Sequence, residues 1–327
     1  MTINSKTTKR YAALDFGTYS TLLLVAREDA TRELVEETEL FRVTRLGADT
    51  AQTGRLTPDG IARTIAAARG FLDIVRAGTA DIAGVAAATS AVRDAANRDV
   101  FLQECRDLLG APPLLLSGND EAVTAFLGAA SDQDPAARIV HIDIGGGSTE
   151  LSAGQRDECL QSHSLNIGSA RLAERFDLFE TVPRAQQERA RQAVRKAVAA
   201  AITDLEDRIA GRRPPQIVAS GGTATTYASM QLGLTEYRRE AVHGFVSTER
   251  KTAEACDNLF DMSVAERRKI PGIEPGRAPV LPAGLVILGE ILHGLGSSAF
   301  TVTTRGLRFG LVRQLQRGDI APTWQLR

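Results

Sequence analysis

The pattern of apolar and polar positions predicts strands and helices that alternate from one end of the chain to the other. Apolar residues are consecutive or alternate in the predicted strands, and they recur every three or four residues in the predicted helices. Segments containing strands are expected at residues 11–25, 33–45, 82–89, 114–116, 139–151, 159–167, 217–228 and 300–304. Helices are expected at residues 56–77, 117–128, 184–209, 278–295 and 306–315, and a helix or turn at 90–97. This alternation predicts the α/β class.

One stretch, residues 139–151, combines a strand, a glycine turn and a second strand. Asp143 interrupts the β-branched run of the first strand, where a carboxylate is unfavourable unless it is paired or binds a metal. The residues that follow Ile144 are Gly145, Gly146, Gly147, Ser148, Thr149 and Glu150. Bare backbone amides in such a turn bind anions, and neighbouring carboxylates suit a hard cation such as Mg²⁺. A glycine-rich hairpin with an exposed aspartate is the alternative.

The same order of residue types occurs earlier in the chain, at residues 11–25. Asp15 lies 128 positions before Asp143, which makes it a second candidate metal ligand. The turn after it contains Gly17, Thr18, Tyr19 and Ser20, and a third turn after a short strand contains Gly221, Gly222 and Thr223. Two such hairpins about one domain length apart predict a duplicated fold with a cleft between its halves. Three unrelated turns are the alternative.

Arg93 follows the carboxyl end of the strand predicted at 82–89. Ligands of open α/β sheets bind at such strand ends, and a guanidinium group can bind phosphate with two hydrogen bonds. Arg93 is therefore a candidate phosphate ligand. An ordinary surface ion pair with Asp94 or Asp99 is the alternative.

Glu121 lies in the first turn of the helix predicted at 117–128. Ser117 and Asp120 fit a capping box at this helix start, which gives Asp120 a structural role but leaves Glu121 without one. The positive end of the helix would keep the Glu121 carboxylate ionised, so it is suited to act as a general base on water. A plain interaction with the helix dipole is the alternative.

Composition limits the possible partners and compartments. The 327 residues allow one large or two ordinary domains, and a net charge of −1 implies no general nucleic-acid surface. No apolar leader or run of about 18 apolar residues is seen, so no membrane association is expected. Three scattered cysteines are typical of reduced thiols in the cytoplasm. The four histidines have no metal-ligand spacing and are expected to be structural.

Nine segments between about Arg10 and Val312, taken in order, resemble the motifs of the exopolyphosphatase and guanosine pentaphosphate phosphohydrolase family. These segments are LDFGTYS, TSAVRDAAN, LSGNDEA, IDIGGGSTEL, SLNIGSARLAERF, SGGTATT, VHGF, ERRKIPGIEPGRA and TRGLRFG. The resemblance implies duplicated ribonuclease-H-like domains, as in actin, sugar kinases and chaperone ATPases, around an interdomain cleft. It implies a first domain at residues 1–118 and a second at 119–305. A closing helix at about 306–320 could pack back on the first domain.

The resemblance also implies roles for the candidate residues. By position, Glu121 resembles the family's catalytic base, Glu150 a second acidic catalytic residue, and Asp143 a metal-binding carboxylate. The three turns and Arg93 resemble its phosphate contacts. The family uses Mg²⁺ or Mn²⁺ to remove the terminal phosphate of inorganic polyphosphate or the corresponding phosphate of guanosine pentaphosphate.

Three residues depart from the family pattern. Tyr19 replaces a usual Asn in the first turn, and Thr304 and Phe309 replace frequent Asp and Glu residues. The expected activity is still that of an exopolyphosphatase. A guanosine pentaphosphate phosphohydrolase, a non-catalytic polyphosphate- or nucleotide-binding protein, and a sugar or acetate kinase are the alternatives.

A preference for short polyphosphate is expected, because a long polyanion needs an extended row of cationic side chains. The densest basic runs, at residues 212–213, 238–239 and 267–269, are short and separated. A homodimer is the assembly to consider, since two subunits could build a longer channel.

Overall fold

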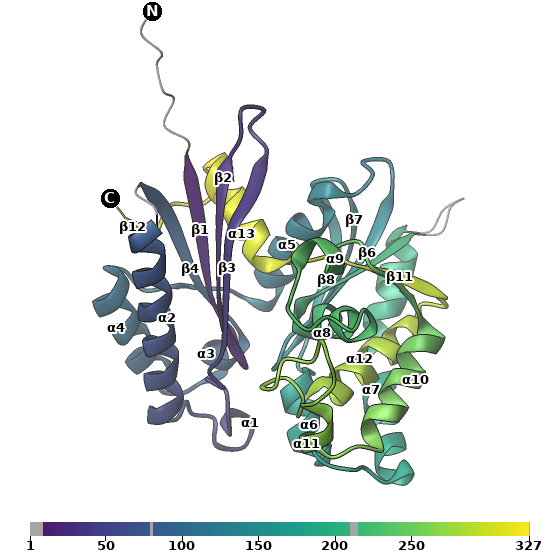
Figure 1. Cartoon of the computed structure of the whole chain (residues 1–327). Helices are drawn as coiled ribbons and strands as arrows, with labels where there is room; N and C mark the ends of the chain where they lie inside the picture. Colours follow the sequence, from purple (N-terminus) through teal and green to yellow (C-terminus); the bar gives the residue numbers. More distant parts are fainter. Residues whose placement is uncertain (1–8, 79–80, 210–214, 327) are drawn as a thin grey trace, which may run out of the picture. The chain divides into compact units, whose positions relative to one another are not determined.

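The computed structural model describes residues 9–78, 81–209 and 215–326, so the basic pair at 212–213 lies outside the described residues. By its internal contacts the chain divides into unit 1, Met1–Leu116 with Arg308–Arg327, and unit 2, Ser117–Leu307 (Figure 1). Each unit is built around one six-stranded sheet. The chain thus passes between the units twice, after Leu116 and after Leu307.

The sheet of unit 1 has the strand order β12-β4-β1-β2-β3, and β5 also pairs with β4. Its strands are β1 (Arg10–Phe16), β2 (Ser20–Glu28), β3 (Leu34–Val43), β4 (Ile82–Ala88), β5 (Leu114–Leu115) and β12 (Trp324–Leu326). The helices of this part of the chain are α1 (Thr50–Thr53), α2 (Pro58–Gly78), α3 (Ser90–Asp94), α4 (Arg98–Leu109) and α13 (Leu307–Arg317). Strand β1 pairs antiparallel with β2 and parallel with β4.

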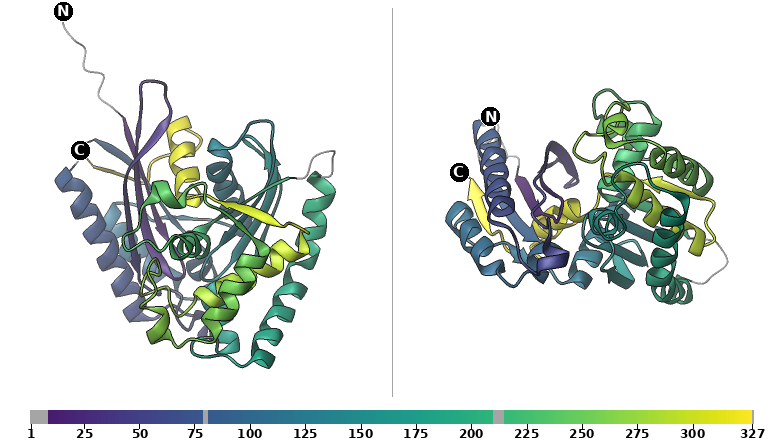
Figure 2. Two further views of the ribbon diagram at one scale, coloured as in Figure 1. Left: turned by 45° about the vertical axis from the view of Figure 1, so that its right-hand side comes forward. Right: turned by 90° about the horizontal axis from the view of Figure 1, so that it is seen from below.

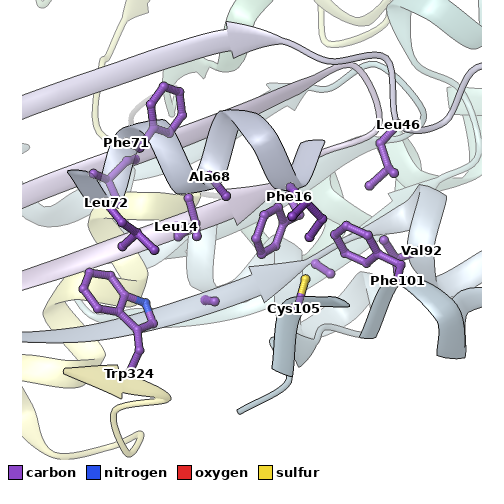
Figure 3. Close-up of a cluster of buried hydrophobic side chains, with 14 of the residues drawn as sticks. Leu14, Phe16, Leu46, Ala68, Phe71, Leu72, Val92, Phe101, Cys105 and Trp324 are labelled. Atoms are coloured by element: carbon purple, nitrogen blue, oxygen red, sulfur yellow. The ribbon is translucent and has the colours of Figure 1, made fainter. Parts of the chain in front are cut away.

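The core of unit 1 lies between this sheet and the helices α2 and α4 (Figure 3). Phe16 of β1 packs edge-on against Phe101 of α4, with ring centroids 5.2 Å apart. Trp324 lies directly over Gly84 of β4, where a side chain would collide with the indole ring. Each large buried side chain contributes about 1.5–3 kcal/mol to folding. This packing fixes the carboxyl ends of β1 and β4, where Asp15 and Arg93 are found.

The sheet of unit 2 has the strand order β10-β11-β9-β6-β7-β8. Its strands are β6 (Arg138–Ile144), β7 (Thr149–Gln155), β8 (Glu158–Leu165), β9 (Gln216–Ser220), β10 (Val246–Thr248) and β11 (Ala299–Val302). Its helices are α5 (Gly118–Ala129), the 3₁₀ helix η1 (Ala130–Asp132), α6 (Ser169–Phe176), α7 (Arg184–Ile209), α8 (Gly221–Gln231), α9 (Arg239–Val242), α10 (Glu249–Phe260), α11 (Val264–Arg267) and α12 (Leu281–Gly294).

Helices cover both faces of the sheet of unit 2. On one face, Phe126 of α5 packs with Ile139 of β6 and Val218 of β9. On the opposite face, His163 of β8 pairs with Asp204 of α7 at 3.4 Å. Helix α7 packs with α12, and α12 packs with α10 (Figure 2). Because both faces of the sheet are covered, a ligand is expected at its carboxyl edge, where β6 and β9 end.

The two sheets share one strand order. Beside the antiparallel strands β1, β2 and β3, unit 1 adds β4 and then β5. The two pairings, β1 with β4 and β4 with β5, are both parallel. Unit 2 repeats this order as β8-β7-β6-β9-β11, with β6, β9 and β11 parallel. This repetition confirms the predicted duplicated α/β fold.

Two expectations about local structure were wrong or incomplete. The third glycine turn does not join two strands, because helix α8 begins directly at Gly221. Strands β10 and β12 were not predicted; each is three residues long and forms only because a distant strand pairs with it. Among the described residues, no helix is both long and apolar enough to cross a membrane.

Candidate functional site

The hairpin β6–β7 brings two predicted site residues together in unit 2. Residues 145–148 connect the strands, and the amide of Gly145 donates to the carbonyl oxygen of Ser148 at 3.0 Å. Asp143 and Glu150 are direct partners across the strands. Directly opposed residues of antiparallel strands point to the same face. The two carboxylates therefore lie side by side on one face of the sheet.

This pair belongs to a polar row that crosses four strands. Asp143 is also the register partner of Ser220 on β9, and Glu150 is the partner of Ser164 on β8. The hydroxyl of Ser164 donates to Oε1 of Glu150 at 2.8 Å. Glu150 is buried, with 2% of its surface exposed. The row Ser220–Asp143–Glu150–Ser164 thus places carboxylates and hydroxyls at the carboxyl edge of the sheet.

Helix α6 supports the glycine turn of this hairpin from one side. The amide of Ser169 donates to the carbonyl oxygen of Gly145, and two further amides of the first turn of α6 donate to Gly146 at 3.0 Å. Gly168 fits only because it lacks Cβ, which would come within 2.5 Å of the backbone of Gly146 and Gly147. Among the described residues, the amides of Gly146, Gly147 and Ser148 have no hydrogen-bond acceptor. Such consecutive amides form an anion-binding concavity.

The turn between β9 and α8 lies against the same carboxylate. Gly221 has a positive φ of 83°, and a Cβ there would collide with Oδ1 of Asp143. Only glycine allows both this conformation and this close approach. Helix α8 begins here, so its first amides and positive dipole end are directed toward the region of Asp143. Thr223 in its first turn is buried.

Arg277 is a candidate that the sequence did not single out. Its guanidinium group lies directly over Gly222, where a Cβ would collide with it. Helix α12 follows Arg277 after a short turn, and Gly284 of α12 leaves room for Thr223. Arg277 and Gly222 are 55 positions apart in the sequence. Only the place of Arg277 in the segment ERRKIPGIEPGRA could have drawn attention to this residue. Arg277 adds a positive charge to the glycine turn.

Helix α5 carries Glu121 close to the polar row. Its first residue, Gly118, lies so close to Ser164 that a Cβ would come within 2.5 Å of the Ser164 side chain. Asn119 accepts a hydrogen bond from Ser162 of β8. Glu121 lies in the first turn of the helix and is 8% exposed. The structure thus brings Glu121, Glu150 and Asp143 into one region of unit 2.

The predicted capping box of α5 is formed in part. The hydroxyl of Ser117 accepts a hydrogen bond from the amide of Asp120 at 3.1 Å. The carboxylate of Asp120 accepts from the Ser117 hydroxyl at 2.6 Å. Asp120 therefore has the structural role expected of it.

The corresponding hairpin of unit 1 has the same frame. The amide of Gly17 donates to the carbonyl oxygen of Ser20 at 3.0 Å, as in the other hairpin. Asp15 lies at the end of β1 but is opposite Leu22, where unit 2 has Glu150. The hydroxyl of Thr18 hydrogen-bonds to that of Ser90 at 2.8 Å, which joins the turn to the start of α3. Asp15, the turn and α3 therefore form one group at the carboxyl edge of this sheet.

Tyr19 and Arg93 of this group have other contacts. The Tyr19 side chain is 7% exposed and lies under the guanidinium group of Arg45 at 5.8 Å. The Tyr19 side chain is therefore buried rather than exposed at the turn. Arg93 donates to the carbonyl oxygen of Leu116 at 2.9 Å and pairs with Asp94 at 3.8 Å. The ion pair considered as an alternative from the sequence is thus formed, together with a contact to the end of β5.

The donor set of unit 2 fits a hard divalent cation. Mg²⁺ in phosphate-handling sites commonly takes one or two protein carboxylates, and substrate phosphates and water complete its shell. Asp143 and Glu150 provide two carboxylates side by side. The described residues contain no group of three or more His, Cys, Asp or Glu side chains that could hold a metal without such help. The residues thus fit an ion shared with a phosphate ligand better than a self-sufficient metal cage.

His141 lies beneath this row and is completely buried. Its Nε2 hydrogen-bonds with the hydroxyl of Ser220 at 2.9 Å, and its Nδ1 lies 3.5 Å from that of Ser152. Burial lowers the pKa of His141 to about 3. A neutral imidazole in this place supports the strand ends and does not act as an acid or base near neutral pH.

Over most of its length the chain is similar to known phosphatases. Residues 24–317 match the model of the Ppx/GppA phosphatase family. Exopolyphosphatase 2 of Mycobacterium tuberculosis is 32% identical over 320 residues, which cover 94% of this chain and 98% of that protein. A guanosine-5'-triphosphate,3'-diphosphate pyrophosphatase of Vibrio parahaemolyticus is 30% identical over 93% of this chain and 59% of its own length. The crystal structure of an exopolyphosphatase-like protein, 30% identical, superposes with a TM-score of 0.85 over 97% of this chain and the whole of that chain.

Proposed function

Because the chain belongs to the Ppx/GppA phosphatase family, we propose that it is an exopolyphosphatase that hydrolyses the terminal phosphoanhydride bond of inorganic polyphosphate. The row Ser220–Asp143–Glu150–Ser164, with Glu121 on the adjoining helix start, carries this proposal. Phosphoryl transfer depends mainly on positioning and on neutralising charge. The row supplies carboxylates, and the turns beside it supply amides directed at an anion.

The terminal phosphate would be bound by the amides of Gly146, Gly147 and Ser148 and by the amino-terminal end of α8. Arg277, which lies over Gly222, would add a guanidinium donor to this phosphate. In unit 1, the amides of the turn Gly17–Ser20 would bind a phosphate in the same way. The three turns and Arg93 therefore remain our candidates for phosphate contacts.

Asp143 would hold Mg²⁺ or Mn²⁺, with Asp15 as a further candidate ligand. Glu150, expected from the sequence to be a catalytic residue, lies beside Asp143 and would also contribute to this ion. When bound, such an ion would neutralise the negative charge of the phosphoryl oxygens. Glu121 would orient the attacking water and accept its proton, since a carboxylate at a helix start stays ionised. Ser164 would hold the Glu150 carboxylate in one orientation.

Guanosine pentaphosphate is the second candidate substrate, because the Vibrio parahaemolyticus relative is named as a pyrophosphatase of this nucleotide. Both substrates end in a phosphoanhydride, so the same groups of unit 2 would serve for either. The two candidates therefore differ in what binds the rest of the molecule, not in the chemistry.

We further propose a preference for short polyphosphate and release after each cleavage. Arg267, one of three consecutive basic residues, is fully buried and donates to the backbone carbonyls of Phe179, Glu180 and Leu259. It is therefore not offered to a polyanion, which shortens an already short basic run. A cytoplasmic location and a homodimer are also proposed; the free thiols of Cys105, Cys159 and Cys256 suit a reducing compartment.

The test is phosphate release from short polyphosphate, long polyphosphate, guanosine pentaphosphate and ATP, each with and without Mg²⁺. The proposal predicts metal-dependent release that is most efficient on short polyphosphate. From a long polymer, a distributive enzyme leaves a population of gradually shortened chains. Binding without release would favour a sensor or scaffold, and ATP-dependent phosphorylation of an acceptor would favour a kinase; either would refute the proposal.

A further inference from the structure

Helix α5, which carries Glu121, is fixed to unit 2 at both of its ends. Its first turn is held against β8 by Gly118 and Asn119, which contact Ser164 and Ser162. Its carboxyl end continues into η1, which ends at Asp132. The contacts of Asp132 therefore add polar bonds to an end of the helix that Phe126, Ala129 and Ala130 already hold through apolar packing.

Asp132 is the centre of a polar cluster formed with His243, Thr304 and Arg305. Its Oδ2 lies 2.8 Å from Nε2 of His243 and 3.5 Å from Nη1 of Arg305. Arg305 also donates to the hydroxyl of Ser131, the residue before Asp132. Burial raises the pKa of the Asp132 carboxyl, but the hydrogen bond from His243 and the charge of Arg305 outweigh this effect and hold the pKa below its usual value.

The other ring nitrogen of His243 faces the segment after β11. The amide of Thr304 donates to Nδ1 of His243 at 3.3 Å, and the hydroxyl of Thr304 lies 3.2 Å from the same atom. Since an amide can only donate, Nδ1 accepts and Nε2 carries the proton that is donated to Asp132. The imidazole thus bridges the end of α5 and the backbone at Thr304.

The residues that follow Thr304 lie close to Asp143 in the fold. The hydroxyl of Thr303 accepts from the amide of Arg305 at 3.1 Å, which keeps this turn tight. Gly306, two positions after Thr304, lies against the row Ser220–Asp143–Glu150–Ser164. A Cβ at Gly306 would be 2.9 Å from the Ser220 hydroxyl and 3.3 Å from Oδ2 of Asp143. The cluster therefore lies between the helix of Glu121 and the backbone that packs on Asp143.

We propose that Asp132 is a positioning residue of this enzyme, which through His243 and Arg305 fixes the helix of Glu121 relative to the segment that packs on Asp143. The inference rests on the proposed phosphohydrolase function. Thr304, one of the departures from the family pattern, has a defined part in this cluster. A misplacement of about 1 Å in a catalytic group can lower turnover about a hundredfold, so loss of the cluster should be visible in kcat.

The test compares the variant Asp132→Asn with Asp204→Asn, a matched control that breaks a His–Asp pair of α7 and β8 in the same unit. For Asp132→Asn, kcat should fall about ten- to a hundredfold, with KM changed less than about twofold, because ground-state binding is not affected. The control should keep both constants. Equal kcat values for Asp132→Asn and the wild type would overturn the inference.

Two further comparisons separate positioning from general damage. His243→Gln keeps one donor and one acceptor and should retain most activity, whereas His243→Leu should behave like Asp132→Asn. In a Glu121→Gln background, Asp132→Asn should lower kcat no further, because the base that it positions is already gone. Additive losses in that double variant would show that Asp132 acts independently of Glu121 and would overturn the inference.

Amide hydrogen exchange tests the cluster independently of activity. Exchange should be faster in Asp132→Asn at the carboxyl end of α5 and at residues 303–306, and unchanged in α7 and α12. Unchanged exchange at these two places would overturn the cluster itself. If wild-type protein releases no phosphate from any substrate, the proposed function fails and the positioning role fails with it, whatever the exchange pattern.

Discussion

The two hairpins, β1–β2 and β6–β7, have one frame but different chemistry. The row that crosses unit 2 is Ser220–Asp143–Glu150–Ser164, and the row at the same level of unit 1 is Ala87–Asp15–Leu22–Phe41. Both keep the aspartate near the end of the central strand, and both have a turn closed by a bond from the glycine amide to the carbonyl oxygen three residues later. Only unit 2 adds a second carboxylate and two hydroxyl groups.

The difference suggests how a duplicated fold divides its tasks. Both loops offer backbone amides to an anion, a property that the hairpin geometry supplies with almost any side chains. Holding a metal and activating water needs particular carboxylates, and three of the four candidates, Asp143, Glu150 and Glu121, lie in unit 2. We therefore propose that unit 2 carries the hydrolytic chemistry and that unit 1 mainly binds phosphate, and four comparisons can break or sharpen this division.

The largest difference is expected between Asp143→Asn and Asp15→Asn. Loss of the charge at Asp143 should lower kcat about 10³-fold, since charge stabilisation by a bound metal contributes several kcal/mol. Asp15→Asn should lower it only about tenfold, because its neighbour on the row is Leu22. The measurement is phosphate release as a function of Mg²⁺ concentration. Equal losses, or an unchanged metal titration for Asp143→Asn, would contradict the division.

The next effect concerns the glycine that packs against each turn, Gly168 in unit 2 and Gly47 in unit 1. In Gly168→Ala the new methyl group would meet the rigid backbone of Gly146 and Gly147, and kcat/KM should fall about a hundredfold. In Gly47→Ala it would meet the side chains of Thr18 and Ala91, so the turn of unit 1 should shift and kcat/KM should fall about tenfold. Steady-state kinetics on short polyphosphate measures both, and a greater loss for Gly47→Ala would reverse the assignment.

A smaller effect is expected at Ser164, whose hydroxyl fixes Glu150. Ser164→Ala should lower kcat about tenfold, the lower end of the loss when a partner of a metal-site ligand is removed. Ser162→Ala, two residues away on the same strand, is the matched control because Ser162 bonds to Asn119 instead. If the two variants have the same kcat, the hydrogen bond to Glu150 has no part in the chemistry.

The smallest effect is on the free energy of unfolding. It concerns His141, which stands where unit 1 has Ala13. His141 has a pKa of about 3 in the folded chain, against about 6.5 when unfolded. Between these values the unfolded chain binds more protons, so stability is lost as the pH falls below about 6.5. The loss from His141 should be about 1.4 kcal/mol per pH unit.

Denaturant unfolding of the wild type and of His141→Asn at pH 7.5, 6 and 5 measures this loss. The wild type should lose stability more steeply than the variant as the solution is acidified. Parallel pH profiles would show that His141 is not held neutral in the folded protein.

Local features of the site followed from the sequence. Asp143, Glu150 and the glycine turn are contiguous in the sequence, so the pattern of strand, turn and strand was enough to identify them as candidate site residues. That the two carboxylates lie on one face depends on the register of β6 and β7. Ser117 and Asp120 were recognised as a cap for the same reason. The duplicated fold could be predicted because its repeated hairpin has a residue order that is visible by eye.

Contacts between distant segments could not be predicted in this way. The partners Ser164 and Ser220 depend on the register of neighbouring strands, and Arg277 reaches Gly222 from another part of the fold. The third glycine turn was taken for a relative of the hairpins, but α8 begins at Gly221 because strand β9 already has parallel neighbours on both sides. The expected cleft between the two halves stays a prediction.

The most direct test of the account is single-turnover phosphate release by Glu121→Gln, with binding of short polyphosphate measured in parallel. Asp120→Asn is the matched control, since Asp120 is the adjacent carboxylate and has a capping role. The account predicts that Glu121→Gln lowers the rate about 10²–10⁴-fold, the usual loss on removing a general base, and leaves polyphosphate affinity close to that of the wild type. The control should keep both the rate and the affinity. A Glu121→Gln protein that releases phosphate at the wild-type rate would contradict the assignment of the chemistry to unit 2.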